Sequence, residues 1–141
     1  MMLGKFISNS ENETIQIGAK FSELLKPGDV VALYGDLGSG KTRFVQGVCQ
    51  GLGVRETVNS PTFIIMNKYE GKLTVYHFDF YRVNSIDEII DLGFNEFVYN
   101  DAVSLIEWAE VAYKILPEKR YEVFLRFTDE ENKREIEIVK L

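Results

Sequence analysis

The chain has 141 residues, 45% of them hydrophobic and 27% charged, which is the balance of an ordinary globular protein and predicts a single domain over residues 1–141. Its formal net charge of −6 argues against tight binding of nucleic acid by the chain alone, because neutralising phosphates requires clustered Lys and Arg. The single cysteine excludes an internal disulfide, and the sequence has neither a signal-peptide pattern nor a run of about 18 apolar residues, so we expect a cytoplasmic protein with no membrane partner.

The first predicted helix covers residues 11–25. Ser10 lies three positions before Glu13, which is the spacing of a capping box, and apolar residues then recur at helical intervals. Glu11 opens this helix. Its carboxylate could accept a hydrogen bond from the amino group of an adenine, or it could simply be favoured there by the helix dipole. The sequence at 26–29 predicts a turn that ends the helix.

The most informative motif is GDLGSGKT at residues 35–42, which matches the pattern G-x-x-x-x-G-K-[ST] of a P-loop. An apolar run at 30–34 predicts a buried strand before it, and residues 44–52 predict a helix after it. Backbone N–H groups of such a loop, together with the N-terminus of its helix, bind nucleotide phosphates. We expect Lys41 to contact the β- and γ-phosphates of ATP and Thr42 to ligate Mg²⁺. The residues predicted to bind the nucleotide are Glu11, Asp36, Leu37, Gly38, Ser39, Gly40, Lys41 and Thr42.

The rest of the chain predicts more strands than helices. The expected segments are strands at 63–69, 73–80 and 102–106, helices at 85–92 and 110–115, and strands at 121–128 and 134–139. Some connections are too short for a crossover helix, so the sheet must contain antiparallel pairs. We therefore predict an α/β fold of the P-loop NTPase type: a mixed β-sheet flanked by a few helices, with parallel strands near the P-loop and a C-terminal antiparallel hairpin.

Two carboxylates lie at the ends of predicted strands that follow the P-loop. A P-loop enzyme needs an acid that holds Mg²⁺ or positions water, and that acid usually ends a neighbouring strand. Asp79 and Glu107 both fit, although either could be a surface carboxylate, and the sequence does not distinguish the metal ligand from the residue that orients water. We predict catalytic roles for Lys41, Asp79 and Glu107, and Mg²⁺ ligation by Thr42, Asp79 and Glu107.

Four further features of the sequence allow more than one interpretation. His77, the only histidine, lies on the same strand face as Asp79 and could contact the site, although a structural role is equally consistent. Residues 60–63 could sense a γ-phosphate, but a proline turn is the favoured interpretation. Trp108 is favoured as a core residue, although beside an acid it could also close the pocket or face a partner. Arg82 could pair with a carboxylate, touch phosphate or form a surface salt bridge.

Four motifs occur in order: GDLGSGKT at 35–42, SPTF at 60–63, HFDFYR at 77–82 and IEW at 106–108. Over nearly the whole chain, this set resembles the TsaE family (also called YjeE), small bacterial ATPases of tRNA threonylcarbamoyladenosine synthesis. The resemblance implies a cytoplasmic ATPase that uses ATP and Mg²⁺, is weakly active alone and works with the TsaB and TsaD proteins, of which TsaD transfers the threonylcarbamoyl group to a tRNA adenosine. It also implies that Lys41 and Thr42 act on phosphates and Mg²⁺, and that Glu107 and Asp79 are needed for function.

Two other functions are compatible with a P-loop. A small-molecule kinase usually carries an arginine-bearing lid, whereas the six arginines of this chain are scattered. A non-catalytic module could bind nucleotide and switch its interactions without turnover. In the family interpretation, tRNA binds the TsaB and TsaD homologues rather than this chain alone.

Overall fold

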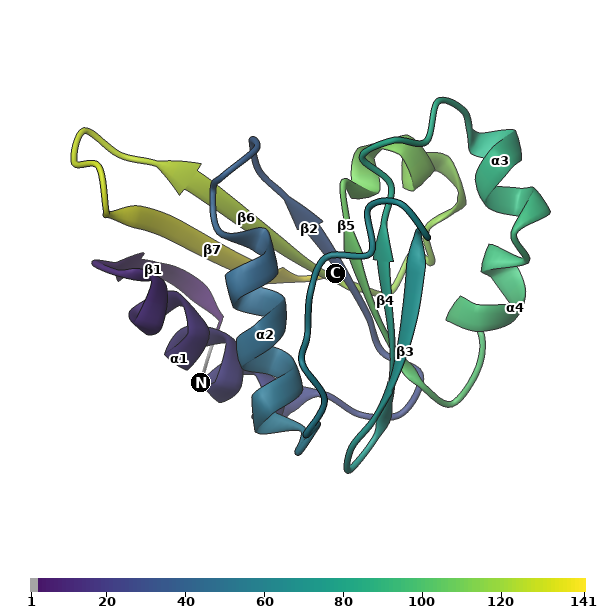
Figure 1. Ribbon diagram of the computed structural model, residues 1–141, viewed down its shortest axis with the longest axis horizontal. Helices are drawn as coiled ribbons and strands as arrows, with labels where there is room; N and C mark the ends of the chain where they lie inside the picture. The colour runs from purple at the N-terminus through teal and green to yellow at the C-terminus, as the bar shows by residue number, and fades with distance from the viewer. Residues whose placement is uncertain (1–2) are drawn as a thin grey trace.

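The computed structural model describes residues 3–141 and shows one mixed β-sheet with helices on both of its faces (Figure 1). Its elements are β1 (Gly4–Ser8), α1 (Glu11–Phe21), the 3₁₀ helix η1 (Ser22–Leu24), β2 (Val30–Tyr34), α2 (Lys41–Gly51), β3 (Met66–Glu70), β4 (Thr74–Asp79), α3 (Ile86–Asp91), α4 (Phe94–Val98), β5 (Val103–Glu107), the 3₁₀ helix η2 (Ala109–Ile115), β6 (Tyr121–Phe127) and β7 (Arg134–Lys140). Met1 and Met2, which the predicted domain includes, lie outside the described residues.

The strand order across the sheet is β1-β7-β6-β2-β5-β4-β3. The four central strands, β6, β2, β5 and β4, pair in parallel, and antiparallel pairing adds β7 and β1 at one edge and β3 at the other. The predicted mixed α/β fold is confirmed, including the C-terminal hairpin of β6 and β7. Parallel pairing next to the P-loop matters most, because it brings the carboxyl ends of several strands to one edge.

The predicted elements have the observed order, but two short elements were missed. β1 is a five-residue edge strand with a glycine, and α4 has five residues, so neither carries enough periodicity to be predicted. The strand expected at 63–69 begins only at Met66, because a turn precedes it. The expected helix at 110–115 is the 3₁₀ helix η2, and the expected helix at 11–25 ends at Phe21 and continues as η1.

The core is divided between the two faces of the sheet because successive side chains of a strand point to opposite faces. On β2, Val31 and Leu33 belong to the core that includes α2 residues, whereas Val30 and Ala32 belong to the core under α3, α4 and η2. A central parallel strand covered on both faces must be apolar throughout. This explains why β2 and β5 appear in the sequence as continuous hydrophobic runs rather than alternating ones.

Helices α1 and α2 pack side by side on one face of the sheet (Figure 1). Their contact is close enough to require glycines: a Cβ on Gly47 would overlap the backbone carbonyl of Ile15, and a Cβ on Gly18 would overlap that of Phe44. Cys49 lies on α2 and is fully buried, and burial raises the pKa of its thiol to about 12, as befits a structural cysteine. The packing fixes α2, whose first residue is Lys41.

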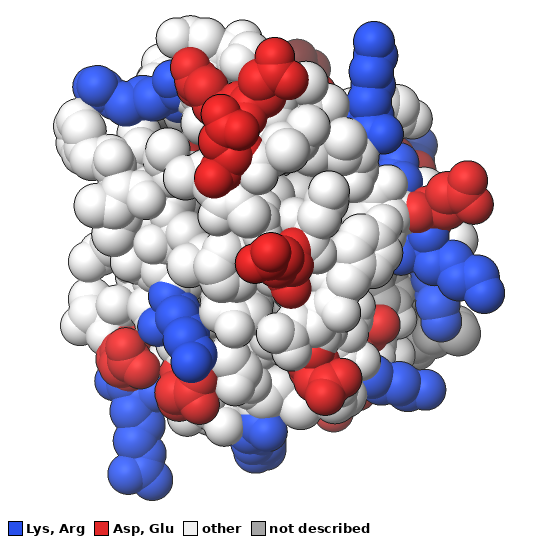
Figure 2. Space-filling model, turned by 90° about the vertical axis from the view of Figure 1, so that its right-hand side faces the viewer, with Lys and Arg blue, Asp and Glu red and all other residues white. Residues whose placement is uncertain are grey.

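Charged side chains are interspersed on the face that Figure 2 shows, with uncharged surface between them. Between Arg82 and Lys114 the sequence contains no Lys or Arg, and this segment includes α3 and α4.

In residues 3–141, no helix is both long enough and apolar enough to cross a membrane.

Gly47→Ala tests the contact between α1 and α2. We expect it to lower the free energy of unfolding by about 1–3 kcal/mol, because the new methyl group must displace backbone, although alanine favours a helix by up to ~1 kcal/mol over glycine. The measurement is urea or thermal unfolding followed by circular dichroism. Gln50→Ala, at an exposed position of the same helix, is the matched control. A Gly47→Ala variant as stable as the Gln50→Ala variant would contradict the close contact.

Candidate functional site

The site lies where the carboxyl ends of the parallel strands meet. Glu107, the last residue of β5, is the register partner of both Leu33 on β2 and Asp79 on β4. The loop that follows β2 leads into α2 through Gly40, whose φ of 106° lies in the left-handed region that glycine adopts without strain. Strand pairing therefore places the glycine loop and two carboxylates at one edge of the sheet.

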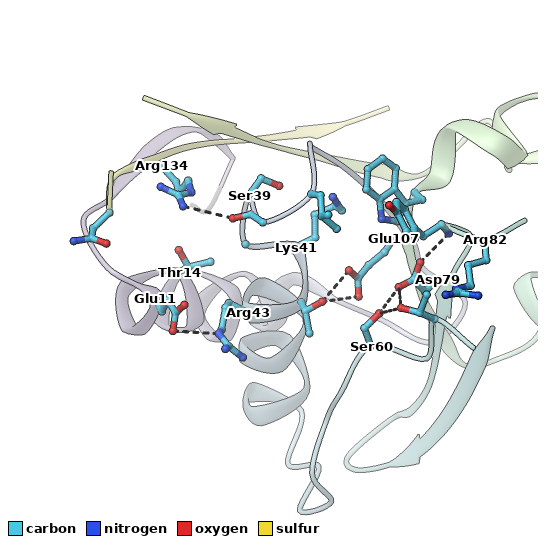
Figure 3. Close-up of a pocket in the computed structure, with 18 of the residues that line it drawn as sticks. Glu11, Thr14, Ser39, Lys41, Arg43, Ser60, Asp79, Arg82, Glu107 and Arg134 are labelled. Atoms are coloured by element: carbon cyan, nitrogen blue, oxygen red, sulfur yellow. Dashed lines mark hydrogen bonds and ion pairs between the residues drawn. The ribbon is translucent and has the colours of Figure 1, made fainter. Parts of the chain in front are cut away.

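A cavity of about 550 Å³ opens at this edge (Figure 3). In Figure 3, Glu11, Thr14, Arg43 and Arg134 lie toward one end, and Glu107, Asp79, Ser60 and Arg82 toward the other. The lining residues are Ser10, Glu11, Thr14, Leu37, Gly38, Ser39, Gly40, Lys41, Thr42, Arg43, Ser60, Thr62, Phe63, Asp79, Tyr81, Arg82, Glu107, Trp108, Asn132 and Arg134. Seven of the eight residues predicted to bind the nucleotide line this cavity. Asp36 does not line the cavity, but its backbone carbonyl accepts a hydrogen bond from Lys41 Nζ.

Lys41 is almost fully buried, at 5% exposure. Its Nζ donates to the carbonyls of Gly35 and Asp36, the latter at 3.2 Å, and lies 4.0 Å from the ring centroid of Trp108. Burial lowers the pKa of Lys41 below its ordinary value, and the nearby carboxylates, led by that of Glu107, oppose this shift. The ammonium is thus held by two uncharged backbone carbonyls and an aromatic ring. An anionic phosphate can replace these partners.

The hydroxyl of Thr42 donates to the Glu107 carboxylate, at 3.0 Å from Oε1 and 3.3 Å from Oε2. Glu107 is 3% exposed, and its Oε2 also lies 2.6 Å from Nε2 of His77, which is fully buried. In P-loop NTPases, Mg²⁺ is held by the hydroxyl of the P-loop Ser or Thr and by an acid at the end of a neighbouring strand. Thr42 and Glu107 have this arrangement.

The second acid, Asp79, is 3% exposed and holds the loop at 60–63. The hydroxyls of Ser60 and Thr62 both donate to its Oδ2, the second at 3.0 Å, and the Tyr81 backbone N–H donates to Oδ1 at 2.9 Å. The favoured interpretation of this segment as only a proline turn is therefore incomplete. Two of its side chains face the cavity and contact a site carboxylate.

The donor set fits a hard cation bound together with phosphates. Thr42, Asp79 and Glu107 offer hydroxyl and carboxylate oxygens, which Mg²⁺ prefers, and Mg²⁺ usually takes only one or two carboxylates and completes its shell with water and phosphate. Residues 3–141 contain no group of three or more His, Cys, Asp or Glu side chains that could hold a metal by itself. Ser39 Oγ is buried in the glycine loop without a partner among the same residues, and a phosphate oxygen could accept its hydrogen bond.

The opposite end of the cavity joins three distant parts of the chain. Glu11 of α1 forms an ion pair with Arg43 of α2 at 3.4 Å, and Arg134 of β7 donates to the Gly38 carbonyl at 3.5 Å. Asn132, in the turn between β6 and β7, also lines this end. The predicted contact of Glu11 with an adenine stays a prediction, since its carboxylate faces Arg43 here and its side chain is largely exposed.

Trp108 confirms one interpretation only in part. The residue packs against the core under α3, α4 and η2, as the favoured interpretation predicts, but it is only half-buried, also lines the cavity and has a left-handed φ of 56° directly after Glu107. Arg82 lies on the ring of Phe63, 4.2 Å from its centroid, at the rim of the cavity. Asn132 and Arg134 were missed altogether, because no sequence pattern indicates that the C-terminal hairpin reaches the P-loop.

Comparison with known proteins gives consistent results. The family model described as threonylcarbamoyl adenosine biosynthesis protein TsaE matches residues 8–136. The tRNA threonylcarbamoyladenosine biosynthesis protein TsaE of Treponema pallidum is 42% identical over 132 residues, covering 94% of this chain and 97% of the relative. The protein of the same name from Bacillus subtilis is 42% identical over 86% of this chain and 77% of its own length. A crystal structure of Bacillus subtilis YdiB superposes with a TM-score of 0.80 at 34% identity, covering 94% of this chain and 81% of that chain.

Trp108 should report ligand binding, because it is the only tryptophan and the Lys41 ammonium lies over its ring. Titration with ADP and Mg²⁺ should give a saturable change in Trp108 emission, since a phosphate would draw Lys41 away from the indole. The Trp108→Phe variant serves as the blank. Emission that stays unchanged while calorimetry records ADP binding would contradict the proximity of Lys41 to Trp108.

Proposed function

The chain belongs to the TsaE family, and from this we propose that it is the ATP-binding and ATP-hydrolysing subunit of tRNA threonylcarbamoyladenosine biosynthesis. The observation that carries the proposal is the hydrogen bond from Thr42 to the buried Glu107 at the mouth of a complete P-loop. A glycine-rich loop alone can bind many anions. The added acid, at the end of the neighbouring parallel strand, is what phosphoryl chemistry requires.

The residues along the cavity have separate roles in this proposal. Lys41 exchanges its backbone carbonyl acceptors for phosphate oxygens, and the unpaired N–H groups at the start of α2 bind the same anion. Thr42 and Glu107 would hold Mg²⁺, which when bound would neutralise phosphate charge. Asp79, with the Ser60 and Thr62 hydroxyls on its carboxylate, lies beside Glu107 and orients the attacking water.

The partners and the RNA follow from the same proposal. We place tRNA on homologues of TsaB and TsaD, because this chain is acidic and has no dense run of Lys or Arg. ATP hydrolysis by this chain then supports the cycle of the complex, and the threonylcarbamoyl transfer takes place on the partner. The chain works with these partners in the cytoplasm.

Lys41→Ala tests the role of the P-loop. We expect ATP hydrolysis to fall by about 100-fold or more, because a preorganised cation beside the transferred phosphoryl group is lost, while the fold survives. Phosphate release and calorimetric ADP binding are the measurements. Lys26→Ala, at an exposed lysine outside the cavity, should match the parent chain. Equal hydrolysis by the Lys41→Ala and Lys26→Ala variants would sink the P-loop assignment.

A second measurement concerns the partner complex. We expect ATP hydrolysis to be weak for the isolated chain and to increase on adding TsaB and TsaD homologues, and we expect tRNA to bind only in the presence of these partners. Phosphate release and a tRNA titration at near-physiological salt measure the two effects. Phosphoryl transfer to a small acceptor without partners would favour a kinase instead. Nucleotide binding with no hydrolysis under any of these conditions would favour a switch module.

A further inference from the structure

His77 is fully buried on β4 and does not line the cavity, yet it contacts the site. Its register partner on β5 is Leu105, which lies two residues before Glu107 and on the same face of the sheet. The imidazole is therefore placed one step beneath the Asp79–Glu107 pair. From there its Nε2 lies 2.6 Å from Oε2 of Glu107.

The two oxygens of Glu107 are held differently: the Thr42 hydroxyl lies within hydrogen-bond distance of both, whereas His77 contacts Oε2 alone. A carboxylate can only accept, so the imidazole donates through Nε2 to Oε2. The Thr42 hydroxyl lies nearer to Oε1, at 3.0 Å, than to Oε2, at 3.3 Å. With one oxygen held from below, the carboxylate plane is fixed and its other oxygen is directed toward Thr42 and the cavity.

A packing role alone does not explain a histidine at this position. Around it the core is built from apolar side chains, among them Val75 and Tyr69, whose ring centroid lies 6.2 Å from that of His77. The other ring nitrogen, Nδ1, is buried without a partner among residues 3–141. An unpaired buried nitrogen carries a cost that an apolar residue would avoid, so the distinctive contribution of His77 is its bond to Glu107.

We propose that His77 is a positioning residue that holds the Glu107 carboxylate in the orientation needed to bind Mg²⁺ together with Thr42. This inference rests on the proposed function, because it concerns the same metal site. Residues that hold a metal-binding side chain in place typically affect metal affinity or activity by about 10–100-fold when they are replaced.

The test compares three variants with the parent chain. His77→Leu removes the donor and keeps an apolar side chain of moderate size, whereas His77→Gln keeps an N–H donor at a similar reach. Tyr69→Phe disturbs the same core without touching Glu107, because the Tyr69 hydroxyl donates to the Asn59 carbonyl and accepts from the Asn67 side chain, but does not contact Glu107. Thermal unfolding of each variant establishes that it is folded.

The first readout is ADP affinity by calorimetry with and without Mg²⁺, and the second is the split between kcat and KM for ATP. His77→Leu should reduce the gain in ADP affinity due to Mg²⁺ about tenfold, with Mg²⁺-free affinity unchanged, and should lower kcat rather than raise KM. His77→Gln should recover most of both effects, and Tyr69→Phe should behave as the parent chain. In a Glu107→Gln background, His77→Leu should add little, because the carboxylate it acts through is gone.

The positioning role is overturned if His77→Leu keeps the full effect of Mg²⁺ on ADP affinity, or if His77→Gln and Tyr69→Phe lose as much of it as His77→Leu. If His77→Gln and Tyr69→Phe lost as much of this Mg²⁺ effect as His77→Leu, core packing and not the N–H donor would be what matters. The proposed ATPase function is decided separately, by whether the parent chain releases phosphate from ATP alone or with its partners.

Discussion

Parallel pairing of β2, β5 and β4 is the constraint on which the rest of the site depends. Because register partners on neighbouring parallel strands reach the same edge, Glu107 and Asp79 come together directly beside the loop that leaves β2. Parallel pairing requires both faces of these strands to be covered, and the two helical layers do this. The close contact at Gly18 and Gly47 then sets α2, and so fixes Lys41 and Thr42 opposite the two acids.

Most of the functional side chains at the phosphate end already have hydrogen-bond partners within the chain. Lys41 donates to loop carbonyls, Thr42 donates to Glu107, and the loop hydroxyls of Ser60 and Thr62 donate to Asp79. Binding of a phosphate would therefore exchange these hydrogen bonds, and it would also supply acceptors to the unpartnered Ser39 hydroxyl and to the first N–H groups of α2. The net gain from such an exchange is small for each bond, which makes the geometry of the few charged groups decisive.

The sequence was most informative where function is local. Residues 35–42 carry their whole pattern in eight positions, and Asp79 and Glu107 could be predicted because each directly ends an apolar strand. Strand order was not encoded locally, so nothing indicated that Asn132 and Arg134 of the C-terminal hairpin would line the same cavity.

Trp108 and His77 show two other limits of sequence reasoning. Trp108 packs only partly against the core, and its ring also lies beside the Lys41 ammonium, at a residue whose left-handed backbone the sequence does not indicate. His77 could be placed on the face of Asp79 from alternation alone. Its actual partner, Glu107, lies on another strand, and pairing between strands distant in sequence cannot be derived from alternation.

The charges of Lys41, Asp79 and Glu107 at the phosphate end depend on one another. Two carboxylates and one ammonium, each at most 5% exposed, leave one negative charge in excess in a water-poor setting. Thr42 and Ser60 donate to these carboxylates from neutral hydroxyls, which stabilise the negative charge without cancelling it. An ATP molecule alone would add further negative charge beside the two acids, whereas a divalent cation between phosphate and carboxylate offsets both. In the proposed function, the same arrangement that makes the acids costly to bury would therefore favour binding of nucleotide and metal as a pair.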